Sequence, residues 1–508
     1  MRVLIWHGWL LEGSGSNIGT ARIAEVLRFA GHDVIVLCQE PHPEHYDWID
    51  AWGTVAAGEP SPLVPSTTAM AAAGRCVLLR PQIGELLPVF VIDEYEGFMV
   101  KTFVDLTPKE LDEYLDRNVE ALAAAARWHD SDVVITGHAV PGAAVAKRAL
   151  GARRYVAKIH GSDIEYAIRP QARYRRLAAE GLEAALVVAG PSAEALRRCR
   201  ALVPSIDGDR TRVIPPGVDV ASFHPRPRSE ALLSLAEQLD ADPDVGRGRP
   251  SSHDIKVARA VGDRDPAALD ELARTYDQEV PDPDAGQRLR ELAGDIAPIV
   301  GYFGKLIPQK GVELMLAGAR SARDDVVPLV VGFGLHREWL AAFDLALRSG
   351  DEATVAWIRD VGGSPVEPVV AAGAAQRRGA IFTGRLDHRY APLAVAAMDV
   401  LVVPSILEEA FGMVAAEGAA AGALPLLARH SGLAEVAGAL EEAAGHPGLF
   451  SFEPGAGAIR QVAAGIDRLL SISPDGRDQL RGDVSAFVAR EYSWDRTTEL
   501  LLDAAVRG

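Results

Sequence analysis

The stretch DVLVVPSILEEAFGMVAAEGAAAG, residues 399–422, contains an apolar run, a short loop and a segment rich in small residues. The run VLVV is typical of a buried strand in a parallel sheet, because both faces of such a strand are covered. A helix is expected to begin near Phe411, and Gly412 beside it allows a ligand to approach the backbone closely. This order favours a doubly wound α/β sheet, which binds its ligands beyond the carboxyl ends of the strands.

Similar apolar runs recur along the chain in two series, with helical periodicity between them. The first series comprises residues 3–6, 34–37, 89–92, 132–136, 155–159 and 185–189, and the second comprises 298–304, 328–334, 380–384, 399–405 and 424–428. Two successive α/β units of the doubly wound, Rossmann-like type are therefore predicted.

The length of 508 residues exceeds what one hydrophobic core usually supports. We expect an N-terminal domain over 1–225 and a C-terminal domain over 298–485. Between them, residues 226–297 are rich in Asp, Arg, Pro and Gly and are expected to form a surface insertion near the interdomain linker. The apolar spacing in 486–508 predicts a terminal helix that packs back on the body of the protein.

Composition and charge exclude several classes of function. The formal net charge of −18 disfavours nucleic acid as a partner. No apolar run approaches about 20 residues, so no membrane-spanning segment is expected, and the opening MRVLIWHGW is typical of a strand rather than a signal peptide. The three cysteines lack metal-ligand spacing, and a cytoplasmic location is expected.

One stretch is locally basic, with arginines at positions 169, 173, 175 and 176. These side chains could contact an anionic acceptor or a membrane surface, so a peripheral membrane contact stays open. A solvated helix face is the simpler explanation.

Two glutamates frame the expected helix start in the opening stretch. Glu409 and Glu417 are eight positions apart, which is about 12 Å along a helix axis and similar to the span from a nucleotide ribose to a sugar on its diphosphate. Between them, the amides of Gly412, Met413 and Val414 would lie unpaired at the positive end of the helix dipole, which favours a diphosphate. Alternatively, Glu409 caps the helix and Glu417 is merely exposed.

A second motif is GYFGKLIPQKG, residues 301–311, in which a strand ends in a turn that carries Lys305 and Lys310. Two ammonium groups at a strand-to-helix junction can neutralise charge that develops on a departing nucleotide diphosphate, and a metal ion is then unnecessary. The alternative is a pair of solvated lysines.

Taken together, these motifs resemble the retaining glycosyltransferases of family 4. The family pattern of two glutamates separated by seven residues is matched by Glu409 and Glu417, with Phe411 and Gly412 between them. Lys305 stands where the family commonly has Arg, which keeps the charge but not the bidentate phosphate geometry. The resemblance implies the GT-B architecture, in which two Rossmann-like, doubly wound domains face a central cleft.

Three further segments carry the same resemblance: VIPPGVDVASFHP at 213–225, GFG at 332–334 and FTGRL at 382–386. The resemblance extends over nearly the whole chain outside 226–297 and 341–379. It implies that Lys305 and Lys310 bind the diphosphate, that Glu417 binds the ribose hydroxyls and that Glu409 contacts the transferred sugar. It also places three residues beside the base, largely through backbone groups: Gly384, Arg385 and Leu386.

The N-terminal half is expected to supply the acceptor side. The segment GSGSNIGT, residues 13–20, lacks the third glycine of a dinucleotide fingerprint and the lysine of a phosphate-binding loop. It resembles the family's glycine loop near the donor phosphates and acceptor, with Gly15, Ser16 and Asn17 as the expected contacts.

Histidines follow several of the N-terminal strands. His160 comes just after the strand at 155–159, where the family resemblance places a histidine near the anomeric carbon and the acceptor. A core histidine bonded to a backbone group is the alternative. His138 and Asp163 are weaker candidates for contacts with acceptor hydroxyls, and His7 is weaker still.

The expected partners are a nucleotide-sugar donor and a small-molecule, glycan or lipid-linked acceptor, with no cofactor and no metal. An epimerase or hydrolase that consumes the same donor is the nearest alternative. A non-catalytic nucleotide-binding regulatory protein is another. A dehydrogenase is least favoured because residues 13–20 miss the dinucleotide fingerprint. The oligomeric state is not predicted.

Overall fold

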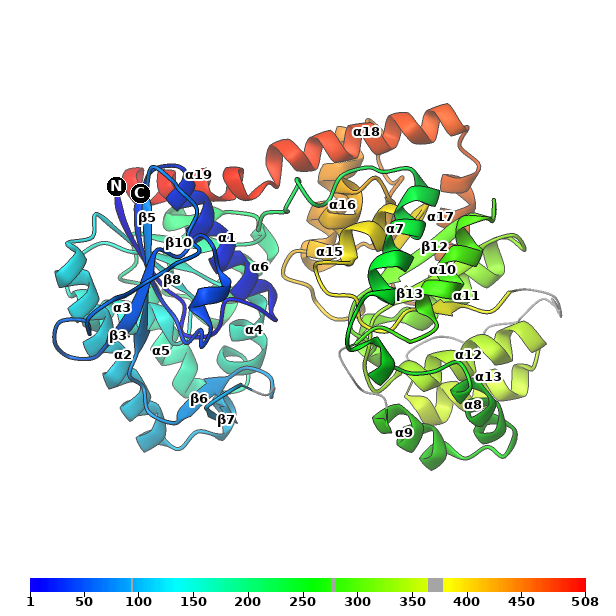
Figure 1. Ribbon diagram of the computed structural model, residues 1–508, viewed down its shortest axis with the longest axis horizontal. Coiled ribbons are helices and arrows are strands. Elements are labelled where there is room, and N and C mark those ends of the chain that lie inside the picture. The colour runs from blue at the N-terminus through cyan, green and yellow to red at the C-terminus, as the bar shows by residue number, and fades with distance from the viewer. Residues whose placement is uncertain (93–94, 276–279, 364–377) are drawn as a thin grey trace. The chain divides into compact units, whose positions relative to one another are not determined.

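The computed structural model describes residues 1–92, 95–275, 280–363 and 378–508. The chain divides into two compact units: Met1–Gly217 with Tyr492–Gly508, and Val218–Glu491 (Figure 1). The chain therefore passes from the first unit to the second after Gly217 and returns after Glu491.

The first unit is built on a nine-stranded sheet with the order β11-β10-β9-β8-β1-β2-β5-β3-β4. All neighbouring strands are parallel except β3 and β4. The strand order reverses between β1 and β8, so the loops that follow these two strands diverge, and this is the position at which sheets of this type bind ligands. The strands are β1 (Arg2–Trp6), β2 (Asp33–Leu37), β3 (Ala51–Val55), β4 (Val64–Pro65), β5 (Arg75–Pro81), β8 (Val133–Gly137), β9 (Val156–Lys158), β10 (Val187–Gly190) and β11 (Thr211–Val213); β6 (Leu86–Val89) and β7 (Met99–Thr102) form a separate parallel pair.

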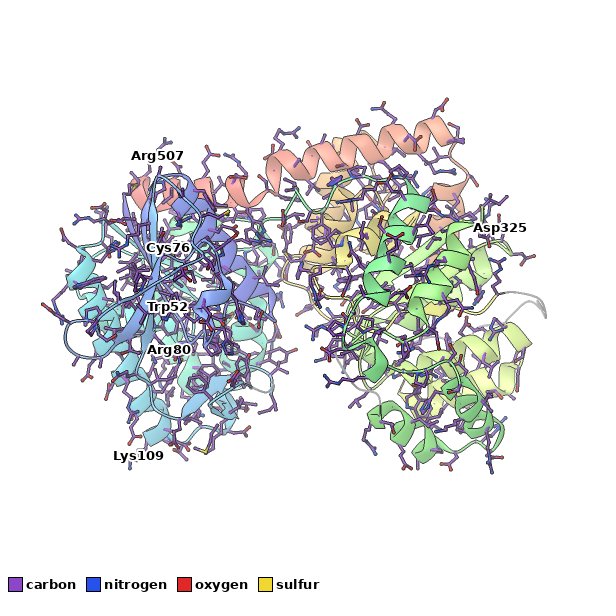
Figure 2. All side chains as sticks on the ribbon, in the orientation of Figure 1. Trp52, Cys76, Arg80, Lys109, Asp325 and Arg507 are labelled. Carbon is purple, nitrogen blue, oxygen red and sulfur yellow. The ribbon has the colours of Figure 1, made fainter. Side chains whose placement is uncertain are left out.

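Helices cover this sheet because its strands are apolar on both faces. Cys76 on β5, labelled in Figure 2, is fully buried, whereas Lys109 at the start of α2 extends into solvent. Buried Trp6 on β1 donates from its indole N–H to the Asn118 side chain on α2, 3.2 Å away, which ties the sheet to that helix. The helices are α1 (Gly15–Phe29), α2 (Pro108–His129), α3 (Gly142–Leu150), α4 (Gly161–Asp163), α5 (Ala172–Leu182), α6 (Ala193–Leu202) and α19 (Trp494–Arg507).

The second unit is built on a six-stranded sheet with the order β14-β13-β12-β15-β16-β17, in which all neighbours are parallel. Counted within the unit, this is the order 3-2-1-4-5-6 of a Rossmann sheet, whose reversal lies between β12 and β15. The strands are β12 (Ile299–Phe303), β13 (Val327–Val331), β14 (Ile381–Phe382), β15 (Val400–Val403), β16 (Leu424–Ala428) and β17 (Ser451–Phe452). The helices after the first of these strands are α11 (Val312–Ala322), α12 (Arg337–Ser349), α13 (Glu352–Gly362), α14 (Ala391–Ala396), α15 (Met413–Ala420), α16 (Ser431–Ala443), α17 (Ala458–Leu470) and α18 (Pro474–Glu491).

The segment 226–297, expected as a surface insertion, instead contributes helices that pack within the second unit. These are α7 (Arg228–Asp240), α8 (His253–Gly262), α9 (Pro266–Thr275) and α10 (Ala285–Ala293), and α7 packs against both α10 and α14. Arg249, only 3% exposed, forms a two-pronged ion pair with buried Glu338 on α12 at 2.6 and 2.8 Å. The charged composition that suggested a solvated surface is therefore partly used for internal ion pairs.

The domain boundaries and two local predictions also differ from the structure. The first unit ends at Gly217 rather than at 225, and the predicted helix over 486–508 is two helices, with α18 in the second unit and α19 in the first. The predicted strand at 89–92 is wrong, because β6 ends at Val89 while Val91 and Ile92 are exposed. The long strand β5 was not predicted from its sequence.

Candidate functional site

The topology of the second unit brings both predicted motifs to one sheet edge. Lys305 and Lys310 follow β12, and Glu409 follows β15. Since β12 and β15 are hydrogen-bonded neighbours at the reversal of strand order, their loops flank the crevice in which such sheets bind ligands.

Backbone contacts hold these two loops against each other. The amides of Ile406 and Leu407 both donate to the carbonyl of Gln309, at 2.9 and 3.1 Å. Gly311 has φ +66°, and a Cβ there would lie 2.3 Å from the carbonyl oxygen of Pro404. Only glycine permits this approach, so the spacing between the motifs is fixed by the backbone.

Lys310 and Glu409 meet directly across this contact. The Lys310 ammonium forms an ion pair with Glu409 Oε1, which also accepts a hydrogen bond from Ser405 Oγ at 2.9 Å. Both charged side chains are about three-quarters buried, with 26% and 21% of their surface exposed. The pair places an ammonium in a partly desolvated position, where it acts more strongly on a nearby phosphate than in water.

The helix after this loop begins two residues later than the sequence indicated. α15 starts at Met413, with Gly412 as its N-cap at φ +117°, and the predicted contact residue Phe411 is buried with 5% exposure. The first amides of the helix, at Met413 and Val414, have no intrahelical acceptor, as at any helix start. The amides that the sequence assigned to a diphosphate therefore do lie at a helix N-terminus.

Replacing Gly412 with Ala is expected to lower the free energy of unfolding by about 1–3 kcal/mol, because the left-handed backbone is strained for any residue with a Cβ. The new Cβ would also lie 2.5 Å from Leu433 Cδ2. Gly438→Ala, inside α16 and with open space around it, is the control and should stabilise by about 0.5–1 kcal/mol. Denaturant unfolding measures both, and equal effects of the two substitutions would contradict the strained cap.

Glu417 lies on α15 and is buried, with 6% exposure. Burial raises the pKa of its carboxyl to about 7. The expectation of a merely exposed glutamate is therefore wrong for this residue. A buried carboxyl without an ion pair in the described structure suits a hydroxyl donor better than a phosphate.

Lys305 lies at the start of the loop that follows β12. Its Nζ is 5.5 Å from the centre of the Phe333 ring, and Arg385 Cζ is 5.1 Å from the same ring. The loop 332–334, with the sequence GFG, packs closely against the turn at Gly304, since a Cβ on Gly332 would lie 1.9 Å from the carbonyl oxygen of Gly304. Both cations therefore make a cation–π contact with the same Phe333 ring, which offsets part of their mutual repulsion.

The predicted base loop is partly occupied by a segment that the sequence did not single out. Arg385 N–H donates to the carbonyl of Val280 at 3.2 Å, and the Gly384 carbonyl accepts from Gly332 N–H at 3.0 Å. Leu386 is buried. Asp282, 1% exposed, anchors this segment through ion pairs with Arg337 and Arg288. The Asp-rich composition around residue 282 indicated a solvated surface, so this anchoring role of Asp282 was not predicted.

In the first unit, histidines gather where β1 and β8 diverge. His7 bonds through Nε2 to Asn17 Oδ1 at 2.8 Å and through Nδ1 to Thr20 Oγ1 at 3.1 Å, so Asn17 serves the core as well as the glycine loop. The His138 ring lies 6.0 Å from that of His7 and 4.3 Å from that of His160. Among the described residues neither ring nitrogen of His138 has a hydrogen-bond partner.

The electrostatics of this cluster keep its imidazoles neutral. Burial lowers the pKa of His7 to about 4 and lowers the pKa values of His138 and His160 well below 6.5, and the nearby Lys158 ammonium acts in the same direction. Burial also lowers the pKa of Lys158 to about 8 and raises that of Asp163 to about 7. A neutral imidazole has one ring nitrogen that donates a hydrogen bond and one that accepts, so it can bind a hydroxyl group at neutral pH.

Asp163 has a local structural role. Its carboxylate accepts the amides of Ala139, His160 and Ile164 at 2.5 to 3.1 Å, which fixes the turns that carry His138 and His160. Direct contact with an acceptor, predicted as the weaker possibility, is therefore not needed to explain this residue.

The remaining N-terminal predictions are at the start of α1. Gly15 and Ser16 are its first two residues, and the Ser14 hydroxyl caps the helix by accepting from Asn17 N–H.

The basic stretch with arginines at 169, 173, 175 and 176 is largely engaged in contacts within the protein. Arg173 donates to the carbonyls of Phe103 and Leu106, at 2.9 and 2.8 Å. Solvated charge is thus a poor description of that arginine.

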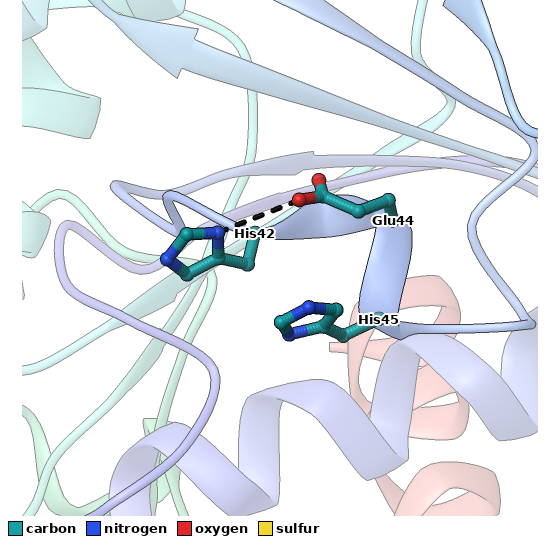
Figure 3. A group of neighbouring side chains, drawn as sticks. All are labelled: His42, Glu44 and His45. Carbon is teal, nitrogen blue, oxygen red and sulfur yellow. Dashed lines mark hydrogen bonds and ion pairs between the residues drawn. The ribbon is translucent and has the colours of Figure 1, made fainter.

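Outside both sheet-edge sites, one group of side chains in the described residues has metal-ligand chemistry. His42, Glu44 and His45 offer ligand atoms within 4.8 Å of one another (Figure 3). No helix in the described part of the chain is long and apolar enough to cross a membrane.

Two family models match the sequence. Glycosyltransferase Family 4 matches residues 94–222, and Glycosyl transferases group 1 matches residues 371–481. No curated protein sequence matches the chain.

Solved structures resemble the whole chain. Sucrose-phosphate synthase from Thermosynechococcus elongatus is 17% identical, with a TM-score of 0.56 over 99% of this chain and 97% of that one. A glycosyltransferase from Rickettsia africae is 14% identical, with a TM-score of 0.55 over 100% and 99%. Anabaena HepE in complex with UDP and glucose is 14% identical, with a TM-score of 0.54 over 99% and 98%.

At such identities the structural likeness establishes the fold, while the family matches establish the class of activity. The predicted α/β class with two Rossmann-like units is confirmed. The chain is a GT4-like glycosyltransferase with the GT-B fold.

Proposed function

We propose that the protein transfers a sugar from a nucleotide-diphosphate donor, with retention of anomeric configuration and without a metal ion in the transfer step. The observation that carries the proposal is the Lys310–Glu409 ion pair beside the start of α15. A cation next to unpaired helix amides suits a pyrophosphate. A solved structure of Anabaena HepE with UDP-glucose supports a nucleotide-sugar donor.

In this proposal Lys310 and the amides of Met413 and Val414 bind the pyrophosphate, and Lys305 approaches it from the other side of the β12 turn. Glu417 accepts the ribose hydroxyls, and Glu409 contacts the transferred sugar while it orients Lys310. The base lies beside residues 384–386, where segment 280–282 shapes one wall.

The acceptor is a small molecule, a glycan or a lipid-linked sugar that binds near His160 in the first unit. No cofactor is needed beyond the donor.

Negative charge moves to the β-phosphate as the bond between sugar and phosphate breaks. Lys310 and the helix amides become stronger partners as this charge grows, and only such contacts accelerate the reaction. The leaving phosphate oxygen can take the acceptor's proton on the same face of the sugar, so no separate general base is required.

A thermal-shift series with UDP, GDP and ADP tests the donor class. The matching diphosphate at 100 times its dissociation constant should stabilise the protein by about 2.7 kcal/mol. Proton NMR of the product formed from the matching nucleotide sugar should then give the anomer of the donor. The absence of a shift with any diphosphate, or an inverted product, would overturn the proposal.

A further inference from the structure

The turn that follows β2 carries a compact group of metal-ligand side chains. η1 (Pro43–His45) is a single 3₁₀ turn, closed by the hydrogen bond from His45 N–H to the carbonyl of His42 at 3.1 Å. Side chains three positions apart eclipse each other in such a turn. The sequence HPEH therefore stacks His42 on His45, with ring centres 5.1 Å apart and planes 20° from parallel.

Glu44 completes the group on the same turn. His42 Nδ1 lies 3.4 Å from Glu44 Oε1, as the dashed line in Figure 3 marks. Two ligands of a tetrahedral zinc ion, each at about 2.0–2.2 Å, are separated by about 3.4 Å. One ligand atom from each of His42, Glu44 and His45 lies within 4.8 Å of the others, so modest rotation of exposed side chains suffices to close the shell.

A second carboxylate orients the first ligand. His42 Nε2 lies 3.0 Å from Glu96 Oε2, on a separate loop. A carboxylate that accepts the Nε2 proton leaves the Nδ1 lone pair, on the side of the ring that faces Glu44, available for a metal ion. This is the outer-shell arrangement that commonly fixes the tautomer of metal-binding histidines.

We propose that His42, Glu44 and His45 bind one Zn²⁺ ion, with water in the fourth position and Glu96 as a positioning residue. Two imidazoles and one carboxylate are the ligand set that zinc accepts with an open fourth position. The sequence predicted no metal because the three cysteines lack metal-ligand spacing. The site is separate from the sugar-transfer step proposed above.

The position of the turn indicates what the ion would stabilise. Glu40, 3% exposed, accepts from His42 N–H at 3.1 Å and from Leu11 N–H at 3.0 Å. The buried carboxylate of Glu40 thus connects the turn at His42–His45 to the loop that precedes α1. Zinc would order residues 38–46 and, through Glu40, the loop around Leu11.

The test is calorimetric titration of ZnSO₄ into untagged, chelator-treated full-length protein. We expect one Zn²⁺ per chain. His42→Ala/His45→Ala should lose this binding, whereas His446→Ala, which removes a solitary exposed histidine, should leave it unchanged. Thermal unfolding of each variant without metal verifies that the chain remains folded.

Glu96→Gln separates a positioning role from a ligand. It should keep one Zn²⁺ per chain and the tetrahedral Co²⁺ absorption spectrum, while the affinity falls about 10–100-fold. Glu44→Gln removes a ligand and should therefore change both the Zn²⁺ stoichiometry and the Co²⁺ absorption spectrum. Hydrogen exchange of 38–46 should slow when Zn²⁺ is added to the wild type. Absence of bound zinc in the wild type, or equal binding by the double histidine variant, would overturn the proposal.

Discussion

Lys310→Ala is expected to reduce kcat by about 10²- to 10³-fold, the cost of removing one preorganised group that stabilises charge in a transition state. The Lys310 ammonium is held by Glu409 beside the first amides of α15, so it is in place before the donor binds. Steady-state kinetics with the matching nucleotide sugar measure the effect.

Two controls separate this role from general damage. Lys310→Arg keeps the charge and should retain more activity than Lys310→Ala, and Lys109→Ala removes a solvent-exposed lysine and should have no effect. Lys310→Ala also leaves Glu409 without its cation, so Lys310→Ala/Glu409→Gln should recover stability without recovering kcat. A folded Lys310→Ala protein with the wild-type kcat would remove Lys310 from the mechanism.

Glu417→Gln is expected to raise the free energy of unfolding at pH 8 by on the order of 3 kcal/mol. The folded protein holds the Glu417 proton more tightly than the unfolded chain, since burial raises this pKa from 4.5 to about 7. Wild-type stability from this group is therefore full below about pH 4.5, falls as the pH rises to about 7, and stays reduced above it. The Gln variant lacks that fall.

Denaturant unfolding at pH 5 and pH 8 measures this difference in wild type and variant. Glu442→Gln, on an exposed part of α16, is the control and should leave the pH dependence unchanged. Glu417→Gln should also bind nucleotide more weakly, because Gln is a poorer acceptor for ribose hydroxyls than a carboxylate. Identical pH dependence in wild type and Glu417→Gln would show that the carboxyl is not held in a desolvated position.

The core of the second unit could be predicted because its signals are local. The apolar runs of β12, β13, β15 and β16 are bounded by Gly, Pro or Asp, and each strand begins and ends within three residues of its predicted place. β5 was missed because RCVLLRP has an arginine at its first and at its last but one position, and these charged residues flank a buried apolar centre. The false strand at 89–92 has the right composition, but only Val89 of its apolar residues joins a strand.

Charged segments were the harder problem. The pairs Arg249–Glu338 and Asp282–Arg337 join residues more than fifty positions apart. A local sequence pattern does not indicate that such distant charges form ion pairs inside the protein. The segment 226–297 was therefore assigned to the surface, although its helices cover the second unit.

Part of the proposed donor site could be predicted from the order of the strands. Topology brings the ends of β12 and β15 together, so Lys310 and Glu409 could be expected in one place from the order of the motifs. The left-handed Gly412 and the burial of Glu417 depend on Leu433 and on the packing of α15, which the sequence does not indicate. The backbone partners of Gly384 and Arg385 depend on segment 280–282 and were missed for the same reason.

The central claim is that Lys310 and the start of α15 bind a pyrophosphate. Calorimetric titration of the matching nucleoside diphosphate against the nucleoside alone tests it most directly. Charge-assisted hydrogen bonds of about 1.5–3 kcal/mol each predict that the diphosphate binds at least about 10²-fold more tightly, and that Lys310→Ala removes most of this difference. A nucleoside that binds the wild type as tightly as its diphosphate would contradict the account.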